Sequence, residues 1–228
     1  MALRPLSGQR LAPLQGPATN LVVLVHGYGA DGNDLISLAG HWQALLPTTE
    51  FVAPNAPDRV PGAPSGFQWF GLTRMDPNEL AKGVAAAGPV LDAFLNEELG
   101  RLGLGSDRLA LVGFSQGTML SLHVGLNRPA KPSAIVGFSG MLAAAPPAGS
   151  SAPPVLLAHG NADSVIPVQA MFAAAADLGA AGVCVQWHMA QGVGHGIDPV
   201  GLDMAGQFLA MAFRGLLARD GQIHCRVG

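Results

Sequence analysis

Residues 109–120 read Leu-Ala-Leu-Val-Gly-Phe-Ser-Gln-Gly-Thr-Met-Leu and decide the fold. The apolar run 109–114 predicts a buried strand, and the stretch 116–127 predicts a helix. Between them, residues 113–117 match Gly-x-Ser-x-Gly, a sharp turn in which the glycines let strand and helix approach closely and the serine is exposed. Because both flanking elements fit, we interpret Ser115 as a candidate nucleophile rather than as part of an ordinary tight turn.

The same alternation of strand and helix continues in both directions. Apolar runs predict strands at residues 21–25, 50–54, 134–138, 155–158 and 183–189, and periodic stretches predict helices at 34–46, 76–99, 168–178 and 198–218. Strands that are apolar on both faces favour an α/β fold, with a mostly parallel central sheet flanked by helices on both faces. Asp34 is the expected cap of the first helix, Gly88-Pro89 predicts a kink in the second, and residues 9–15 are a candidate edge strand.

Length and composition predict one domain over residues 1–228, with an N-terminal arm or edge strand at 1–20 and a tail at 219–228. Hydrophobic residues make up 49% of the 228, which is enough to form a core. The spacing between elements leaves no room for a large lid domain. No apolar run approaches the roughly 18 residues of a membrane span, and charges and prolines interrupt residues 4–13. We therefore expect no stable membrane insertion and a cytoplasmic location.

Charge and metal-ligating residues exclude several functions. The net charge is −3 and lysine and arginine are not clustered, so no nucleic-acid partner is expected. Cys184 and Cys225 have neither a disulfide framework nor a metal-binding spacing. His26 and His159 fall in different loops without a carboxylate cluster, so we expect them to brace strand ends rather than bind a metal. Residues 27–32 match a bare Gly-x-Gly-x-x-Gly, but no acidic residue ends the next strand, so no dinucleotide cofactor is expected.

A serine hydroxyl needs a base to accept its proton, and in this type of fold the chain order is serine, acid, histidine. Asp163 follows the strand at 155–158, where its alternative roles are an Asx turn or a helix cap. His195 lies in a glycine-rich turn before the last helix, where its alternative role is to support that turn. Because the carboxyl ends of parallel strands meet at one edge, we predict that both lie near Ser115.

Two further groups of candidates complete the site. The backbone N–H groups of Gln116 and Tyr28 are the expected oxyanion donors, since they follow the nucleophile and an earlier strand. The loop at 55–75 is long and aromatic, which is typical of a functional loop. The candidate substrate-binding residues of an exposed apolar groove are Phe67, Trp69, Phe70, Leu72, Met75, Met141 and Ile166. The alternative is that these side chains only pack the loop onto the sheet.

The segments at 24–35, 113–117, 159–167 and 194–197 together resemble the bacterial phospholipase/carboxylesterase family, which includes acyl-protein thioesterase-like enzymes of the α/β-hydrolase fold. The resemblance implies a catalytic triad of Ser115, Asp163 and His195, and hydrolysis of carboxylic esters or thioesters without a cofactor. Family members often carry Trp-Phe/Tyr-Asp near the acyl site. Residues 69–71 read Trp-Phe-Gly, so the acid is absent here.

These observations predict a serine carboxylesterase that hydrolyses short-to-medium acyl esters of small molecules through an acyl-enzyme. Three alternatives stay open: an acyl-thioesterase or lysophospholipase, a dienelactone hydrolase-like enzyme, and a catalytically inactive binding protein on the same scaffold. The low charge and the apolar helix faces allow a homodimer, which the family often forms.

Overall fold

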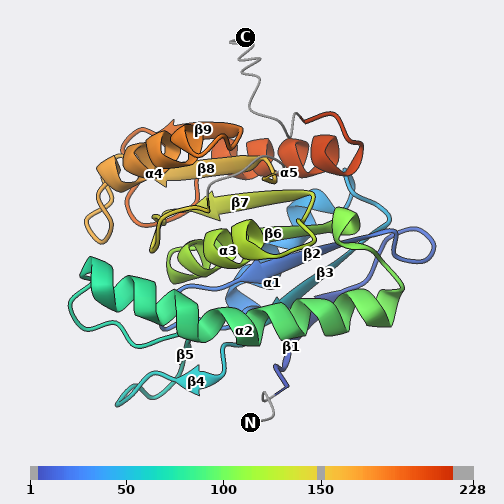
Figure 1. The fold of residues 1–228 in the computed structure, drawn as a ribbon. Coiled ribbons are helices and arrows are strands. Elements are labelled where there is room, and N and C mark those ends of the chain that lie inside the picture. Colours follow the sequence, from blue (N-terminus) through green and yellow to red (C-terminus); the bar gives the residue numbers. More distant parts are fainter. Residues whose placement is uncertain (1–4, 148–151, 218–228) are drawn as a thin grey trace.

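The structure is a computed structural model that describes residues 5–147 and 152–217. Within these residues, a seven-stranded sheet has the strand order β1-β3-β2-β6-β7-β8-β9 (Figure 1). Its strands are β1 (Gly8–Leu11), β2 (Asn20–Val25), β3 (Thr49–Pro54), β6 (Leu109–Phe114), β7 (Ala134–Phe138), β8 (Val155–Gly160) and β9 (Val185–Ala190). The six strands β3, β2, β6, β7, β8 and β9 pair with their neighbours in parallel, and β1 pairs antiparallel with β3. The predicted mostly parallel sheet is confirmed.

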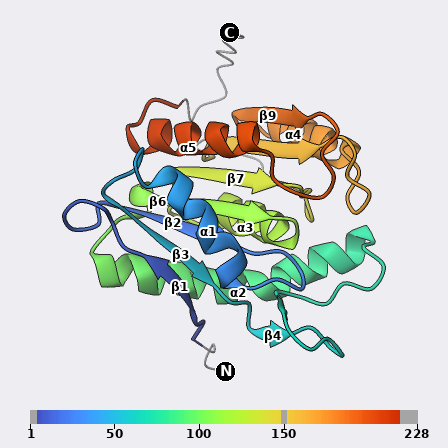
Figure 2. The same ribbon diagram turned by 180° about the vertical axis from the view of Figure 1, so that it is seen from behind.

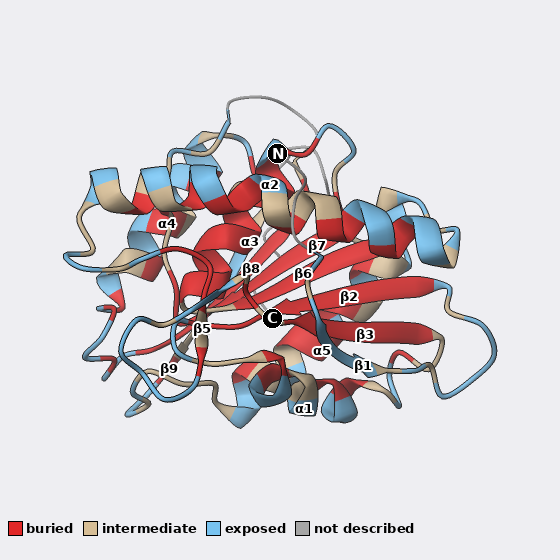
Figure 3. Ribbon diagram, turned by 90° about the horizontal axis from the view of Figure 1, so that it is seen from below, coloured by how far each residue is buried: buried red, intermediate tan, exposed pale blue. Residues whose placement is uncertain are grey.

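Helices cover both faces of the sheet, as predicted (Figures 1 and 2). The helices are α1 (Gly32–Trp42), α2 (Pro77–Leu102), α3 (Gln116–Asn127), α4 (Gln169–Ala180) and α5 (Pro199–Phe213). Successive side chains of a strand point to opposite faces. Thus Leu111 packs in the core under α2, α3 and α4, whereas Val112 packs in the core under α1 and α5. Every residue of β2, β3 and β7 is buried, which is why these strands read as continuous apolar runs (Figure 3).

The first helix begins earlier than predicted. Asp31, not Asp34, is its N-cap, and the Asp31 carboxylate accepts hydrogen bonds from the N–H groups of Asn33 and Asp34. The Asp34 carboxylate in turn accepts the Asp31 N–H at 3.0 Å. The two aspartates form a capping box. The sequence analysis predicted Asp34 as the cap, although Asp34 is the residue at the third helical position of this box.

The closing helix ends earlier than predicted, at Phe213 rather than at residue 218. Gly215 adopts a left-handed conformation with φ +67°, and the Leu216 N–H donates to the Met211 carbonyl at 2.9 Å. This is the usual way in which a glycine closes a helix. Residue 218 and the predicted tail at 219–228 lie outside the described residues, as do residues 148–151 between β7 and β8.

The long helix and the long loop also differ in detail from the predictions. Helix α2 continues through Pro89 to Leu102, three residues beyond the predicted end, and Asp76, where the predicted helix begins, is its N-cap. The loop at 55–75 contains a short antiparallel hairpin of β4 (Asp58–Arg59) and β5 (Phe67–Gln68). Strands of two residues are too short to show a period, so the sequence prediction missed them.

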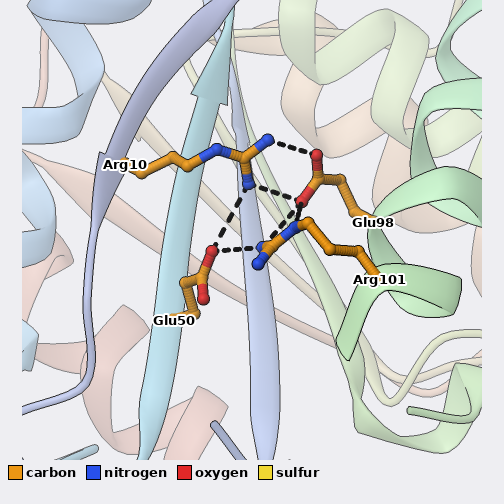
Figure 4. A network of polar contacts seen from close by, with 4 residues as sticks. All are labelled: Arg10, Glu50, Glu98 and Arg101. Carbon is orange, nitrogen blue, oxygen red and sulfur yellow. Dashed lines mark hydrogen bonds and ion pairs between the residues drawn. The ribbon is translucent and has the colours of Figure 1, made fainter. Parts of the chain in front are cut away.

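The candidate edge strand exists, and an ion-pair network attaches it to the rest of the molecule (Figure 4). Arg10 of β1 and Arg101 of α2 both contact the carboxylates of Glu50 and Glu98. The Glu98 side chain is buried, and Arg10 lies opposite Val52 in the pairing of β1 with β3. Burial would raise the pKa of Glu98, but hydrogen bonds from the two guanidinium groups hold that pKa below its ordinary value.

Candidate active site

The turn between β6 and α3 has the predicted geometry of a nucleophile elbow. Ser115 is half-buried and adopts φ +53° and ψ −115°, a conformation that is strained for a residue with a side chain. A Cβ atom on Gly117 would lie 1.8 Å from the Val25 carbonyl oxygen, and one on Gly113 would lie 2.5 Å from the Gly117 carbonyl group. The two glycines therefore let α3 start directly against β2 and β6, which raises Ser115 at the carboxyl edge of the sheet.

The predicted acid and base are in direct contact. Asp163 follows β8 and His195 follows β9, and the Asp163 Oδ2 and His195 Nδ1 atoms are 2.7 Å apart. The other carboxylate oxygen of Asp163 accepts the backbone N–H groups of Val165 and Ile166 at 2.8 and 2.9 Å. On the nucleophile side, the His195 ring packs against the ring of Phe114, with centroids 5.1 Å apart. The structure thus brings the loops that carry all three predicted residues to one edge.

The charge of Asp163 determines which nitrogen of His195 carries a proton. Burial would raise the pKa of Asp163, but the Ile166 and Val165 N–H groups and the His195 hydrogen bond hold that pKa below its ordinary value. An ionised carboxylate only accepts hydrogen bonds, so the Nδ1 atom of His195 must be the donor. In a neutral imidazole the other nitrogen, Nε2, then has a free electron pair and can accept a proton.

His159 is a second histidine that contacts the carboxylate of Asp163. Its Nε2 atom lies 2.8 Å from the Ile166 carbonyl oxygen and 3.1 Å from the Asp163 Oδ2 atom. A carbonyl only accepts hydrogen bonds, so His159 Nε2 carries the proton and donates it to this pair of oxygens. The side chain is buried, and its predicted role as a brace is confirmed.

His26 braces the end of β2, also as predicted. Its Nδ1 atom is 2.7 Å from the Gly27 carbonyl oxygen, and its Nε2 atom accepts the Ala56 N–H at 2.9 Å. Burial lowers the pKa of His26, which keeps the imidazole neutral and suited to donate with one nitrogen and accept with the other. Within residues 5–147 and 152–217, no three His, Cys, Asp or Glu side chains are grouped to hold a metal ion.

The predicted oxyanion donors, Gln116 and Tyr28, lie in two segments that both hydrogen-bond to the loop at 55–75. The first segment is linked through the side-chain amide of Gln116, and the second through backbone hydrogen bonds. Gln116 is the first residue of α3, where N–H groups have no carbonyl partner within the helix. Its buried side chain accepts the Trp69 N–H at 2.9 Å and donates to the Phe70 carbonyl at 2.8 Å. Beside Tyr28, the Gly29 N–H donates to the Phe67 carbonyl at 2.9 Å. Sequence reasoning missed this bridging role of the Gln116 side chain.

The seven predicted groove residues divide into two groups. Trp69, Phe70 and Ile166 are buried in the core, which favours the packing alternative for these three side chains. The Trp69 indole also donates to the His26 carbonyl at 3.0 Å. The half-buried residues at the margin of this core are Phe67, Leu72, Met75 and Met141.

Glu79 holds the segment that carries two of these half-buried side chains. Its carboxylate accepts the N–H groups of Thr73, Arg74 and Met75 at 2.7 to 2.9 Å, together with the Thr73 hydroxyl. The Thr73 hydroxyl is the largest cause that lowers the pKa of Glu79, which falls to about 2. Met75 adopts φ +55° within this wrapped segment. We call these contacts of Glu79 the Glu79 clamp, and they fix the segment that carries Leu72 and Met75. The only sequence signal for the clamp is the position of Glu79 in the first turn of α2.

Comparisons with known proteins identify the family of this chain. The phospholipase/carboxylesterase family matches residues 8–213. The chain is 31% identical over 182 residues to the esterase YpfH of Escherichia coli, covering 80% of this chain and 78% of that protein. It is 28% identical to acyl-protein thioesterase 1 of Gibberella zeae, covering 90% and 97%. The crystal structure of the esterase PE8 superimposes with a TM-score of 0.86 at 43% identity, covering 94% of this chain and 100% of that one.

The fold is therefore that of the α/β-hydrolases, as the resemblance implied. The chain belongs to the phospholipase/carboxylesterase family and is a carboxylesterase-type hydrolase. In the part of the chain that the structure describes, no helix combines the length and the apolar character that crossing a membrane requires.

Proposed function

We propose that this protein is a serine carboxylesterase in which Ser115 is the nucleophile, His195 the base and Asp163 the group that orients it. The observation that carries the proposal is the 2.7 Å contact between His195 Nδ1 and an ionised Asp163, together with a strained serine elbow whose Phe114 ring packs against the ring of His195. With Nδ1 committed to the carboxylate, Nε2 is the proton acceptor that a serine hydroxyl needs.

The reaction proceeds in two halves. The Ser115 hydroxyl oxygen attacks the ester carbonyl carbon while its proton passes to His195 Nε2. The N–H groups of Gln116 and Tyr28 hold the oxyanion that forms, and its collapse expels the alcohol, which takes the proton from Nε2. Water then attacks the acyl-enzyme with His195 again as base, and the carboxylic acid leaves.

For the acyl group we propose short-to-medium chains bound along the half-buried side chains Phe67, Leu72, Met75 and Met141. These four are apolar and lie at the rim of the core. The hairpin holds Phe67, and the Glu79 clamp holds the segment that carries Leu72 and Met75. A chain-length series of aryl esters tests this proposal, with kcat/KM expected to peak at short-to-medium acyl groups.

A thioester substrate is the second candidate, because the chain aligns over 90% of its length with a protein named acyl-protein thioesterase 1. An acyl-thioester of the same chain length, assayed beside the aryl ester, separates the two, as a lactone does for a dienelactone hydrolase-like activity. The homodimer stays a prediction that sedimentation can test.

The deciding experiment is labelling with a fluorophosphonate, which bonds covalently to an activated serine. We expect one label per chain, on the peptide that contains Ser115, and no label in Ser115→Ala. That variant should lose kcat by on the order of 10⁴ or more. Ser37→Ala, an exposed serine on α1, is the control and should keep both labelling and activity. An unlabelled wild-type chain would instead identify an inactive binding protein.

A further inference from the structure

Strand β7 ends among the three loops of the site, although it carries none of the proposed catalytic residues. The Phe138 carbonyl accepts the Ser115 N–H at 2.9 Å and the Thr118 hydroxyl at 2.8 Å. The next residue, Ser139, donates its N–H to the Ala158 carbonyl at 2.9 Å, at the end of the strand that leads to Asp163. The peptide between residues 138 and 139 thus joins the nucleophile loop to the acid loop.

The side chain of Ser139 reaches the third loop. Its hydroxyl donates to the Gly196 carbonyl at 2.8 Å, and Gly196 directly follows His195. Ser139 is fully buried, so this hydroxyl has been removed from water and its one strong acceptor is that carbonyl. The ring of His195 is held at Nδ1 by Asp163, and the hydroxyl of Ser139 holds the backbone of the residue that follows His195.

The backbone of Ser139 indicates that the hydroxyl has a role that glycine would not fill. Ser139 adopts φ +45°, a conformation that glycine reaches without strain. Strained residues persist where the surroundings over-determine them, and they gather at functional sites. The following Gly140 packs so closely that a Cβ atom would lie 2.3 Å from the Thr118 Cβ, so the segment cannot relax in that direction.

We propose that Ser139 is a positioning residue for His195. By holding the Gly196 carbonyl, it keeps the imidazole at the place where its second nitrogen takes the Ser115 proton. The proposal rests on the proposed serine mechanism. A shift of the base by about 1 Å costs on the order of 100-fold in rate, so one hydroxyl at this place can matter without touching substrate.

Ser139→Gly is the sharpest test, because it removes the hydroxyl and also removes the backbone strain. We expect kcat for an aryl ester to fall by about 10- to 100-fold with KM nearly unchanged, and the rate of fluorophosphonate labelling at Ser115 to fall in parallel. The thermal midpoint should fall by less than it does in Ser139→Ala, because the relieved strain offsets part of the lost hydrogen bond. Ser139→Ala should lose the same activity and should have a lower midpoint than the glycine variant.

Ser133 supplies the matched control. It is also buried and also donates its hydroxyl to a backbone carbonyl, that of Asp107, at the opposite end of β7. Ser133→Ala should lower the thermal midpoint and leave kcat and the labelling rate within about twofold of wild type.

Two outcomes would overturn the proposal, and they are distinguishable. If the wild-type chain labels at Ser115 and Ser139→Gly labels and turns over equally fast, Ser139 is only structural while the proposed function stands. If the wild-type chain neither labels nor hydrolyses esters, the proposed function fails and the role of Ser139 fails with it.

Discussion

Two buried carboxylates, Asp163 and Glu98, lie at opposite ends of the sheet and look alike by the usual criteria. Both side chains belong to residues that are less than a tenth exposed, and both accept hydrogen bonds from nitrogen atoms of arginine or histidine side chains. Both also have a pKa below the ordinary value. Asp163 follows the carboxyl end of β8, whereas Glu98 shares its arginine partners with Glu50, the second residue of β3. The chemical groups that contact the two carboxylates differ. This difference distinguishes a carboxylate of the candidate site from one that only stabilises the fold.

The partners of Glu98 are two guanidinium groups, which carry a positive charge at every relevant pH. The charge of Glu98 is therefore already compensated. Asp163 is held by backbone N–H groups, which carry no net charge, and by two imidazole rings. Its negative charge remains available to stabilise the positive charge that His195 gains when it takes a proton. Burial with a depressed pKa alone does not mark a catalytic group.

The largest expected difference between the two carboxylates is in turnover. Asp163→Asn should lower kcat by about 10⁴, because an amide can no longer enforce the Nδ1–H form of His195. Glu98→Gln should leave kcat within about twofold, because its partners among the described residues, Arg10 and Arg101, lie outside the site. Aryl-ester hydrolysis of both purified variants measures this. A comparable loss in both variants would mean that the two carboxylates are not functionally distinct.

The second expected difference is in stability. Glu98→Gln should lower the free energy of unfolding by about 2 kcal/mol, because hydrogen bonds to two charged groups are weakened within a buried network. Denaturant unfolding followed by far-ultraviolet circular dichroism measures the change. The control is Glu97→Gln, an exposed neighbour on the same helix, which should stay within about 0.5 kcal/mol. Equal midpoints for the two glutamine variants would show that the network adds nothing.

Sequence reasoning reached one carboxylate of this pair and missed the other. Asp163 was predictable because strand, glycine-rich turn and chain order are local patterns, and a parallel sheet gathers its strand ends. Glu98 was not, because its partner Arg10 lies 88 residues away, and no period reveals which distant side chain a helix residue meets. Ser139 was missed for the same reason: its hydroxyl acts on a carbonyl 57 residues further along.

A third comparison tests how much the support of Asp163 contributes. His159→Leu should lower kcat by about tenfold, because the Asp163 Oδ2 atom then loses its second donor and the buried carbonyl of Ile166 loses its partner. His159→Gln, which keeps an N–H donor, should lose less. His188→Gln is the control, since His188 Nε2 lies at the same 3.1 Å from a carboxylate, that of Asp198, away from the triad. A wild-type kcat in His159→Leu would contradict the bracing role.

The smallest expected effect is on the pH dependence of unfolding. The pKa of Glu98 is lower in the folded chain than its ordinary value of 4.5, so near pH 4 the unfolded chain binds more protons than the folded chain. The stabilisation is therefore complete above about pH 4.5 and is lost as the pH falls through the folded pKa. In Glu98→Gln the unfolding free energy should fall less steeply below that pH than in wild type.

Asp163→Asn should flatten the curve in the same direction, but only from a lower pH, because the ordinary pKa of an aspartate is 3.8. His26, whose pKa is also lowered, adds a loss of stability below about pH 6.5 that is common to all three chains and cancels in the comparison. Unfolding curves from pH 7 to pH 3 measure these slopes. Parallel curves for wild type and Glu98→Gln would show that the two arginines do not hold the Glu98 carboxylate in its ionised form.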